Sequence, residues 1–140
     1  MRTRIFLSML LLLAAYTGRS QDLSGTWHGF QVSRENGQYK EYRITIEIKM
    51  SDGNGFTGTM QLKSPAKGVI TSTFTGKIDK AENAIYLRED KIVTEGLTTK
   101  DASLCNYVLK FRGNMLKGKG RSMRKGYDHL TLHLERNERY

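Results

Sequence analysis

Residues that cross-link or interrupt a chain are scarce in this sequence, whose 140 residues include one cysteine, one proline and one tryptophan. Because Cys105 is the only cysteine, no disulfide can form within the chain, and packing must stabilise the fold. No proline-rich linker or low-complexity tract divides the chain, and no apolar pattern predicts a helix longer than one turn. These absences favour a single domain built from strands.

The N-terminus carries the one long apolar run of the sequence. A basic head at residues 1–4 precedes apolar residues 5–15, and a small residue, Ser20, follows shortly after. This layout is typical of a secretory signal peptide that is cleaved after Ser20. The run is too short to span a bilayer, which takes about 20 apolar residues. We therefore predict a signal peptide at residues 1–20, no transmembrane span, and export to the periplasm or the extracellular space.

The remaining chain, residues 21–140, is long enough for one domain with a modest core. It keeps 20 Lys and Arg residues against 14 Asp and Glu, so it is moderately basic. No cysteine lies near residue 20, which argues against a lipid anchor at the new N-terminus. We predict a single domain over residues 21–140, either monomeric or a small oligomer.

Eight short segments alternate apolar and polar residues with the period of two that a half-buried strand requires. In the clearest, 39–50, every second residue from Tyr42 to Met50 is apolar and those between are polar. Asn36-Gly37 precedes it, and Asn-Gly between alternating segments is a strong signal for a tight hairpin. The eight segments are 25–33, 39–50, 56–62, 70–78, 84–92, 105–111, 116–122 and 129–135.

The connections between these segments are short except at 63–67 and 93–103. Successive strands joined by tight turns pair antiparallel, and closing the sheet removes its exposed edges. Four glycines fall on the inner face, where a small barrel needs room and sharp bending. The sequence therefore predicts an all-β fold, an eight-stranded antiparallel up-and-down β-barrel, with Gly58, Gly76, Gly118 and Gly120 pointing inward.

Gly25-Thr26-Trp27 at the start of such a barrel resembles the Gly-x-Trp signature of the calycin superfamily, which includes lipocalins, fatty-acid-binding proteins and avidins. In that superfamily the tryptophan plugs the closed end of the barrel, and a basic residue of the last strand commonly packs over it. The resemblance implies these roles for Trp27 and Arg136. Residues 55–59, Gly-Phe-Thr-Gly-Thr, are also similar to the third strand of avidins, although avidins place several tryptophans around biotin. The chain further resembles secreted bacterial β-barrels of unassigned function, and the resemblance as a whole implies a lipocalin-like barrel.

A meander sorts its connections into two ends of the barrel. The two longest, 63–67 and 93–103, fall at the end opposite Trp27, so we predict the mouth of the barrel there. Inward polar residues lie in the same half, above an apolar floor, which is how a small-ligand barrel is built. The predicted ligand-binding residues are Tyr42, Ser72, Glu89, Cys105, Tyr107 and Ser122.

A second interpretation of these six residues stays open, because polar side chains near a barrel rim can be hydrated without binding a ligand. Glu89 could pair with a tyrosine, an arginine or a backbone group. In the ligand interpretation it accepts hydrogen bonds from the ligand or pairs with a cation. Cys105 is expected to be a small buried side chain and not a reactive thiol, because no neighbour in the sequence would lower its pKa.

Two neighbouring segments carry basic residues on their outer face, around the turn at Gly113-Asn114. Like charges that lie opposite one another on a sheet repel, so a bound anion would stabilise this face. Candidate partners are lipopolysaccharide, an acidic glycan or an acidic protein surface, and the alternative is a solvated face without a partner. The predicted anion patch comprises Lys110, Arg112, Lys117, Lys119 and Arg121, extended by Arg124 and Lys125.

The sequence has no Gly-x-Ser-x-Gly motif, no paired acids and no Cys–His arrangement with an orienting third group. His129 and His133 cannot share a metal, because four residues along a strand span about 13 Å. We expect no enzymatic activity, metal, cofactor or nucleic-acid partner. We predict instead that the barrel binds a small apolar or amphipathic ligand in its upper cavity. The alternatives are a periplasmic protein-binding module of the protease-inhibitor type, and an envelope scaffold that binds an anionic polymer through the basic hairpin.

Overall fold

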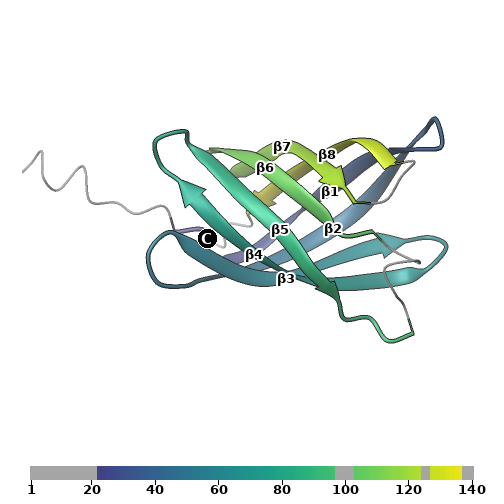
Figure 1. Ribbon diagram of the computed structural model, residues 1–140, viewed down its shortest axis with the longest axis horizontal. Helices are drawn as coiled ribbons and strands as arrows, with labels where there is room; N and C mark the ends of the chain where they lie inside the picture. The colour runs from purple at the N-terminus through teal and green to yellow at the C-terminus, as the bar shows by residue number, and fades with distance from the viewer. Residues whose placement is uncertain (1–21, 97–102, 124–126, 137–140) are drawn as a thin grey trace, which may run out of the picture.

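The computed structural model describes residues 22–96, 103–123 and 127–136, and these form eight antiparallel strands that close into a barrel (Figure 1). Each strand pairs with the next in sequence, and the last returns to pair with the first, which confirms the predicted up-and-down topology. The strands are β1 (Gly25–Glu35), β2 (Gln38–Met50), β3 (Gly55–Ser64), β4 (Gly68–Asp79), β5 (Ala84–Ile92), β6 (Cys105–Arg112), β7 (Met115–Ser122) and β8 (Tyr127–Arg136).

Some of the predictions fall outside the described residues. The predicted signal peptide at residues 1–20 lies there, as do Arg124 and Lys125 of the basic hairpin. In the part of the chain that the structure describes, no helix is both long and apolar enough to cross a membrane.

The two ends of the barrel differ, and we name them by their contents. The closed end holds Trp27, near the start of β1, together with the end of β8. The mouth is the opposite end, where the β1–β2, β3–β4, β5–β6 and β7–β8 connections lie, at the right of Figure 1.

The strands at the mouth are longer than the sequence predicted. Lys63 pairs with Val69 and Ser64 with Gly68, so the ladder continues to the turn and only residues 65–67 connect β3 to β4. The predicted longer loop at 63–67 is therefore wrong. Gly68 adopts φ 76°, a left-handed conformation that a residue with a side chain rarely takes, and this allows the tight turn.

β1 also runs further than predicted, to Glu35, which pairs with Gln38. The two residues between them, Asn36 and Gly37, have φ values of 50° and 82°. Positive φ at both central positions defines the type I′ turn, whose twist matches that of the flanking strands. The predicted Asn-Gly hairpin is thus confirmed, with two more residues of β1 paired.

The interior of the closed half is an apolar core. Alternate residues of every strand enter it, as the period of two requires. Trp27 and Phe111 meet there edge to face, with ring centres 6.3 Å apart. The largest fully buried side chains are Trp27, Tyr107, Phe56, Phe74, Leu23, Ile44, Ile46, Met60, Ile85, Leu109, Leu116 and Leu132.

Inward glycines provide the space that these aromatic rings occupy. Gly58 pairs with Phe74 and Gly76 with Phe56, so each ring lies over a glycine on the neighbouring strand. A methyl group added at Gly76 would lie 2.2 Å from Cζ of Phe56. The two rings in turn pack edge to face at 6.1 Å. The predicted role of inward glycines as room for a tightly filled barrel is therefore confirmed for this pair of strands.

Candidate functional site

The closed end is plugged as the calycin resemblance implies. Trp27 is fully buried, and its Nε1 donates a hydrogen bond of 2.9 Å to the carbonyl of Leu23. The guanidinium carbon of Arg136 lies 4.6 Å from the centre of the indole ring. An arginine over a tryptophan face is a favourable cation–π contact. This end therefore offers no space to a ligand.

The mouth half of the barrel encloses a cavity of about 200 Å³. Its lining comes from all eight strands, so the cavity is the lumen of the barrel itself. Apolar lining residues are Leu62, Ala66, Ile70, Ile92, Cys105 and Leu130. Polar and charged ones are Gln31, Ser33, Glu35, Lys40, Tyr42, Ser64, Lys67, Ser72, Glu89, Ser103 and Ser122.

Five of the six predicted ligand-binding residues line this lumen: Tyr42, Ser72, Glu89, Cys105 and Ser122. The sixth, Tyr107, is fully buried and belongs to the core. Its hydroxyl accepts a hydrogen bond from Nε2 of Gln31, a lining residue of the lumen. The six residues predicted from the sequence are thus neighbours in space, with Tyr107 adjoining the lumen.

Glu89 continues the inward alternation of Ile85 and Leu87, and an irregularity in β5 follows directly after it. Glu89 pairs with Phe74 of β4, but the next pair on β4 joins Thr73 to Lys91, so Asp90 is an extra residue. Such a β-bulge re-aims the side chains that follow it. It leaves Lys91 exposed, and Ile92 lines the lumen instead.

The carboxylate of Glu89 accepts two short hydrogen bonds. Ser72 Oγ donates to one oxygen at 2.6 Å, and the backbone N–H of Cys105 donates to the other at 2.6 Å. The β5–β6 ladder ends at the pair Arg88 and Asn106, so Glu89 takes over from the ladder as the acceptor for Cys105. Burial raises the pKa of Glu89, and the two hydrogen bonds oppose this without cancelling it.

The titratable neighbours of Glu89 stay neutral over the ordinary pH range. Burial and the nearby Glu89 carboxylate raise the pKa of the Cys105 thiol to about 12. Burial also raises the pKa of Tyr107 well above its ordinary value of 10. A thiol with this pKa is a poor nucleophile, so Cys105 contributes bulk and not reactivity, as its sequence context predicts.

β1 contributes lumen residues that were not predicted from the sequence. Gln31 and Ser33 are buried, and Glu35 lies at the rim. The hydroxyl of Tyr42 donates to the Glu35 carboxylate at 2.9 Å, and Lys40 pairs with the same carboxylate at 3.2 Å. The sequence contains a signal for these residues. Alternate residues of a strand share a face, so Gln31, Ser33 and Glu35 are expected on the same inward face as Trp27.

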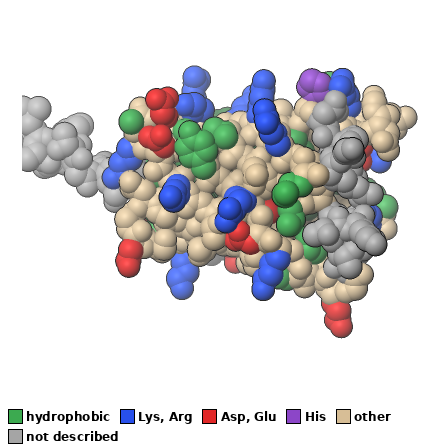
Figure 2. All heavy atoms as spheres, in the orientation of Figure 1, with side chains coloured by type: hydrophobic (Ala, Val, Ile, Leu, Met, Phe, Trp, Pro, Cys, Tyr) green, Lys and Arg blue, Asp and Glu red, His purple; other side chains and the backbone are tan. Residues whose placement is uncertain are grey.

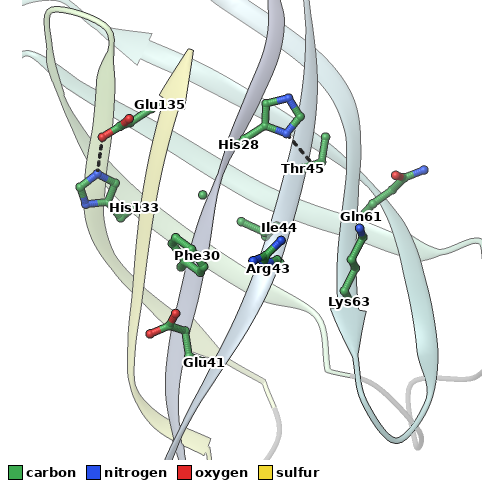
Figure 3. Close-up of a pocket in the computed structure, with 11 residues that line it drawn as sticks. His28, Phe30, Glu41, Arg43, Ile44, Thr45, Gln61, Lys63, His133 and Glu135 are labelled. Atoms are coloured by element: carbon green, nitrogen blue, oxygen red, sulfur yellow. Dashed lines mark hydrogen bonds and ion pairs between the residues drawn. The ribbon is translucent and has the colours of Figure 1, made fainter. Parts of the chain in front are cut away.

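A larger hollow, of about 640 Å³, lies on the outside of the barrel over β8, β1, β2 and β3 (Figure 3). His28 contacts Thr45 at 3.2 Å, and His133 contacts Glu135 at 3.4 Å. Its basic residues are balanced by acidic ones, so it offers no net charge to a ligand. The charged groups that line it are Arg43, Lys63, Glu41 and Glu135.

The predicted anion patch forms on the outer face of β6 and β7. Lys110 lies directly opposite Lys117, whereas Lys119 faces Val108 and Arg121 faces Asn106. Lys110 Nζ donates to the backbone carbonyl of Glu82 at 2.6 Å. Arg112 pairs with Met115 at the end of the hairpin, and all five basic residues are exposed. Figure 2 shows one face of the barrel, on which Lys and Arg side chains stand around exposed hydrophobic ones.

The described residues contain no group of three or more His, Cys, Asp or Glu side chains that could hold a metal ion. His129 and His133, which the sequence placed too far apart for one metal, both lie on β8, with three residues between them.

No known protein family and no curated protein sequence matches this chain. Among solved structures, the barrel is similar to a de novo designed fluorescence-activating β-barrel, with a TM-score of 0.60. The match covers 82% of this chain and 94% of the designed one at 15% sequence identity. At this identity the similarity establishes the fold alone, an eight-stranded antiparallel β-barrel.

Proposed function

We propose that this protein is a non-catalytic, exported barrel that binds a small amphipathic molecule in the lumen at its mouth. The observation that supports this most is the division of the interior. One half is a packed core plugged by Trp27, and the other half is a cavity of about 200 Å³ with both polar and apolar lining. Pockets with a few convergent polar groups on an apolar wall are the usual form of small-ligand sites.

The polar groups of the lumen are ordered by one another. Ser72 and Cys105 hold Glu89, Tyr42 and Lys40 hold Glu35, and Ser103 contacts Ser122. Among the described residues, every buried side-chain nitrogen or oxygen has a hydrogen-bond partner. A preorganised lining of this kind loses little entropy when a ligand binds, which favours binding.

A neutral probe, 1-hexanol, tests this proposal without assuming a charge on the ligand. Titration followed by amide NMR shifts should perturb Ser72, Cys105 and Ser122 most strongly. Ile70→Phe places a larger side chain in the lumen and should abolish the shifts. The matched control is Val69→Phe, which adds the same ring at the adjacent, outward-facing and exposed position. Equal shifts in both variants would contradict binding in the lumen.

The basic outer face supports a second candidate function, binding of an anionic polymer. The specific observation is the direct pairing of two lysines, Lys110 and Lys117, whose like charges repel. Tyr86 and Val108, both 46% exposed, lie beside this pair and add an apolar contact surface. The function would use the outside of the barrel and leave the lumen untouched.

Retention on an anionic matrix tests this candidate. Elution should require more salt for the wild type than for Lys117→Glu/Lys119→Glu, because the variant has a weaker screened attraction to the matrix. A variant with the same charge change on the opposite side of the barrel, Lys49→Glu/Lys63→Glu, is the control. Equal loss of retention in both variants would show that net charge alone, and not this patch, binds the matrix.

A further inference from the structure

Glu89 places a carboxylate in the lumen beside neutral hydrogen-bond donors. Its hydrogen-bond donors, Ser72 Oγ and the Cys105 N–H, are both neutral, and it forms no ion pair among the described residues. The other lumen carboxylate, Glu35, is already paired with Lys40. An ionised carboxylate taken out of water is costly unless a cation or several donors compensate it.

The bulge in β5 affects which charged side chains face the lumen beside Glu89. In a regular strand, the residue two positions after an inward Glu89 would also face inward, and that residue is Lys91. The extra residue Asp90 turns Lys91 to the outside, where it is exposed. The bulge thus turns Lys91 away from the lumen, where a regular strand would have placed it next to Glu89 on the inner face.

We propose that the lumen selects a protonated amine, with its ammonium group on Glu89 and a short apolar body against the aliphatic lining. This inference rests on the proposed function and names the ligand class of the same site. One oxygen of Glu89 accepts from Ser72 Oγ and the other from the Cys105 N–H, and a carboxylate oxygen can accept a second hydrogen bond, here from an ammonium N–H. The aliphatic lining that would contact the body of the amine consists of Leu62, Ile70, Ile92 and Leu130.

Among the described residues, the basic side chains that line the lumen are Lys40, which is paired with Glu35, and Lys67, and Lys67 does not make the cavity favour an anionic ligand. Lys67 lies on the β3–β4 turn and is exposed, whereas Glu89 is largely buried. Charge interactions are stronger away from water, because the effective dielectric constant is lower there. Glu89 therefore dominates recognition inside the cavity, and the ligand headgroup it selects is cationic.

Three probes of equal chain length separate the possible headgroups: n-hexylamine, 1-hexanol and hexanoate. Calorimetry should give the order amine, then alcohol, then carboxylate, with the amine about 10- to 100-fold tighter than the alcohol, as expected for a charge-assisted hydrogen bond. Glu89→Gln should reduce amine affinity to that of the alcohol. Glu41→Gln, which removes an exposed carboxylate from the outer face of β2, should change nothing.

The Glu89→Gln variant is suited to this test because it keeps the hydrogen bonds. The amide oxygen of the introduced glutamine can accept from the Cys105 N–H, and its NH2 group can donate to Ser72, whose hydroxyl also accepts. Amine affinity should rise with pH as Glu89 ionises and then level off, whereas alcohol affinity should not rise. Cys105 and Tyr107 stay protonated over this range, and the rim charges Glu35, Lys40 and Lys67 are common to both probes.

The outcomes separate the two proposals. If amine and alcohol bind equally in the lumen, the headgroup inference is overturned and the proposed function stands. Preference for hexanoate overturns it as well and points to Lys67. If none of the three probes binds, both proposals fail. If the Glu89→Gln variant does not fold, the order of affinities of the three probes and the pH profile of the wild type still decide whether the lumen selects an amine.

Discussion

Arg136 lies with its guanidinium carbon 4.6 Å from the centre of the Trp27 ring, at directly paired positions of β8 and β1. The contact joins the first and last strands, so it closes both the barrel and its base. The backbone N–H of Arg136 also donates to the carbonyl of Asn114, which ties the β6–β7 turn to the same corner.

Arg136→Ala should therefore lower the free energy of unfolding by about 0.5–2 kcal/mol, the range for a cation–π contact. Urea unfolding measures the change. Because Trp27 is the only tryptophan, its fluorescence reports on this corner directly, and its emission should shift as the ring gains water. Arg121→Ala, at an exposed position of β7, is the control. If both variants lose the same stability and emission is unchanged, the contact contributes nothing.

Glu89 should make the protein less stable as the pH rises. Burial raises its pKa above the ordinary value of 4.5, so between these two values the folded state holds a proton that the unfolded state has released. Stability contributed by this proton is complete below pH 4.5 and is lost as the pH rises through the raised pKa. The Glu89→Gln variant cannot titrate at this position, so its free energy of unfolding should not fall for this reason as the pH rises.

Urea unfolding of the wild type and Glu89→Gln at pH values from about 4 to 8 measures the effect. Relative to the wild type, the variant should gain about 1.4 kcal/mol for each unit by which the pKa is raised. Other carboxyl groups titrate in both proteins and cancel in the difference. A difference that stays constant across the range would mean that Glu89 ionises freely in the folded state.

Gly120→Ala should destabilise the barrel by about 1–3 kcal/mol, although replacing glycine usually stabilises a strand. The added methyl would lie 2.6 Å from Cδ1 of Tyr107 and 2.9 Å from Cδ2 of Leu130. Chemical denaturation of a double-mutant cycle with Tyr107→Leu isolates the clash. The same substitution should cost less in the Tyr107→Leu background, and equal cost in both backgrounds would refute a steric cause.

Cys105 should resist alkylation in the folded protein. Its pKa of about 12 leaves almost no thiolate at neutral pH, and the side chain is buried. Iodoacetamide labelling followed by intact mass should show slow modification in buffer and rapid modification in denaturant. Since the chain has one cysteine, a single mass shift is unambiguous. Rapid labelling of the folded protein would contradict the burial of this thiol.

The barrel was predictable from the sequence where apolar alternation is regular. β2, with its run from Tyr42 to Met50, is the plainest example, and its inward face is as predicted. The Asn36-Gly37 turn and the Arg136 contact with Trp27 depend on local chemistry or a short motif, and these too were predictable. The register of eight strands then follows from short turns and from the demand that each apolar face points inward.

The lumen was predicted less completely, because several of its inward-facing residues are polar, whereas inward positions of a barrel are usually apolar. In the mouth half of β1 the apolar Phe30 points outward and the polar Gln31 and Ser33 point inward, so the apolar residues there indicate the wrong face, and the inward positions follow only from the register set by Trp27. The bulge at Asp90 leaves no signature in the sequence, since it depends on how β4 and β5 pair. The length of the β3–β4 connection was overestimated, because the polar residues Lys63 and Ser64 continue the β-ladder and only residues 65–67 form the turn.

The central claim is that the mouth-end lumen carries a small molecule, and native mass spectrometry of protein purified from its own host tests it most directly. The wild type and the Val69→Phe control should each carry one discrete adduct, released on denaturation and containing a basic nitrogen. Ile70→Phe, which fills the lumen, should be free of it. If all three proteins have the mass of the bare chain, or if Ile70→Phe keeps the adduct, the lumen is not the binding site.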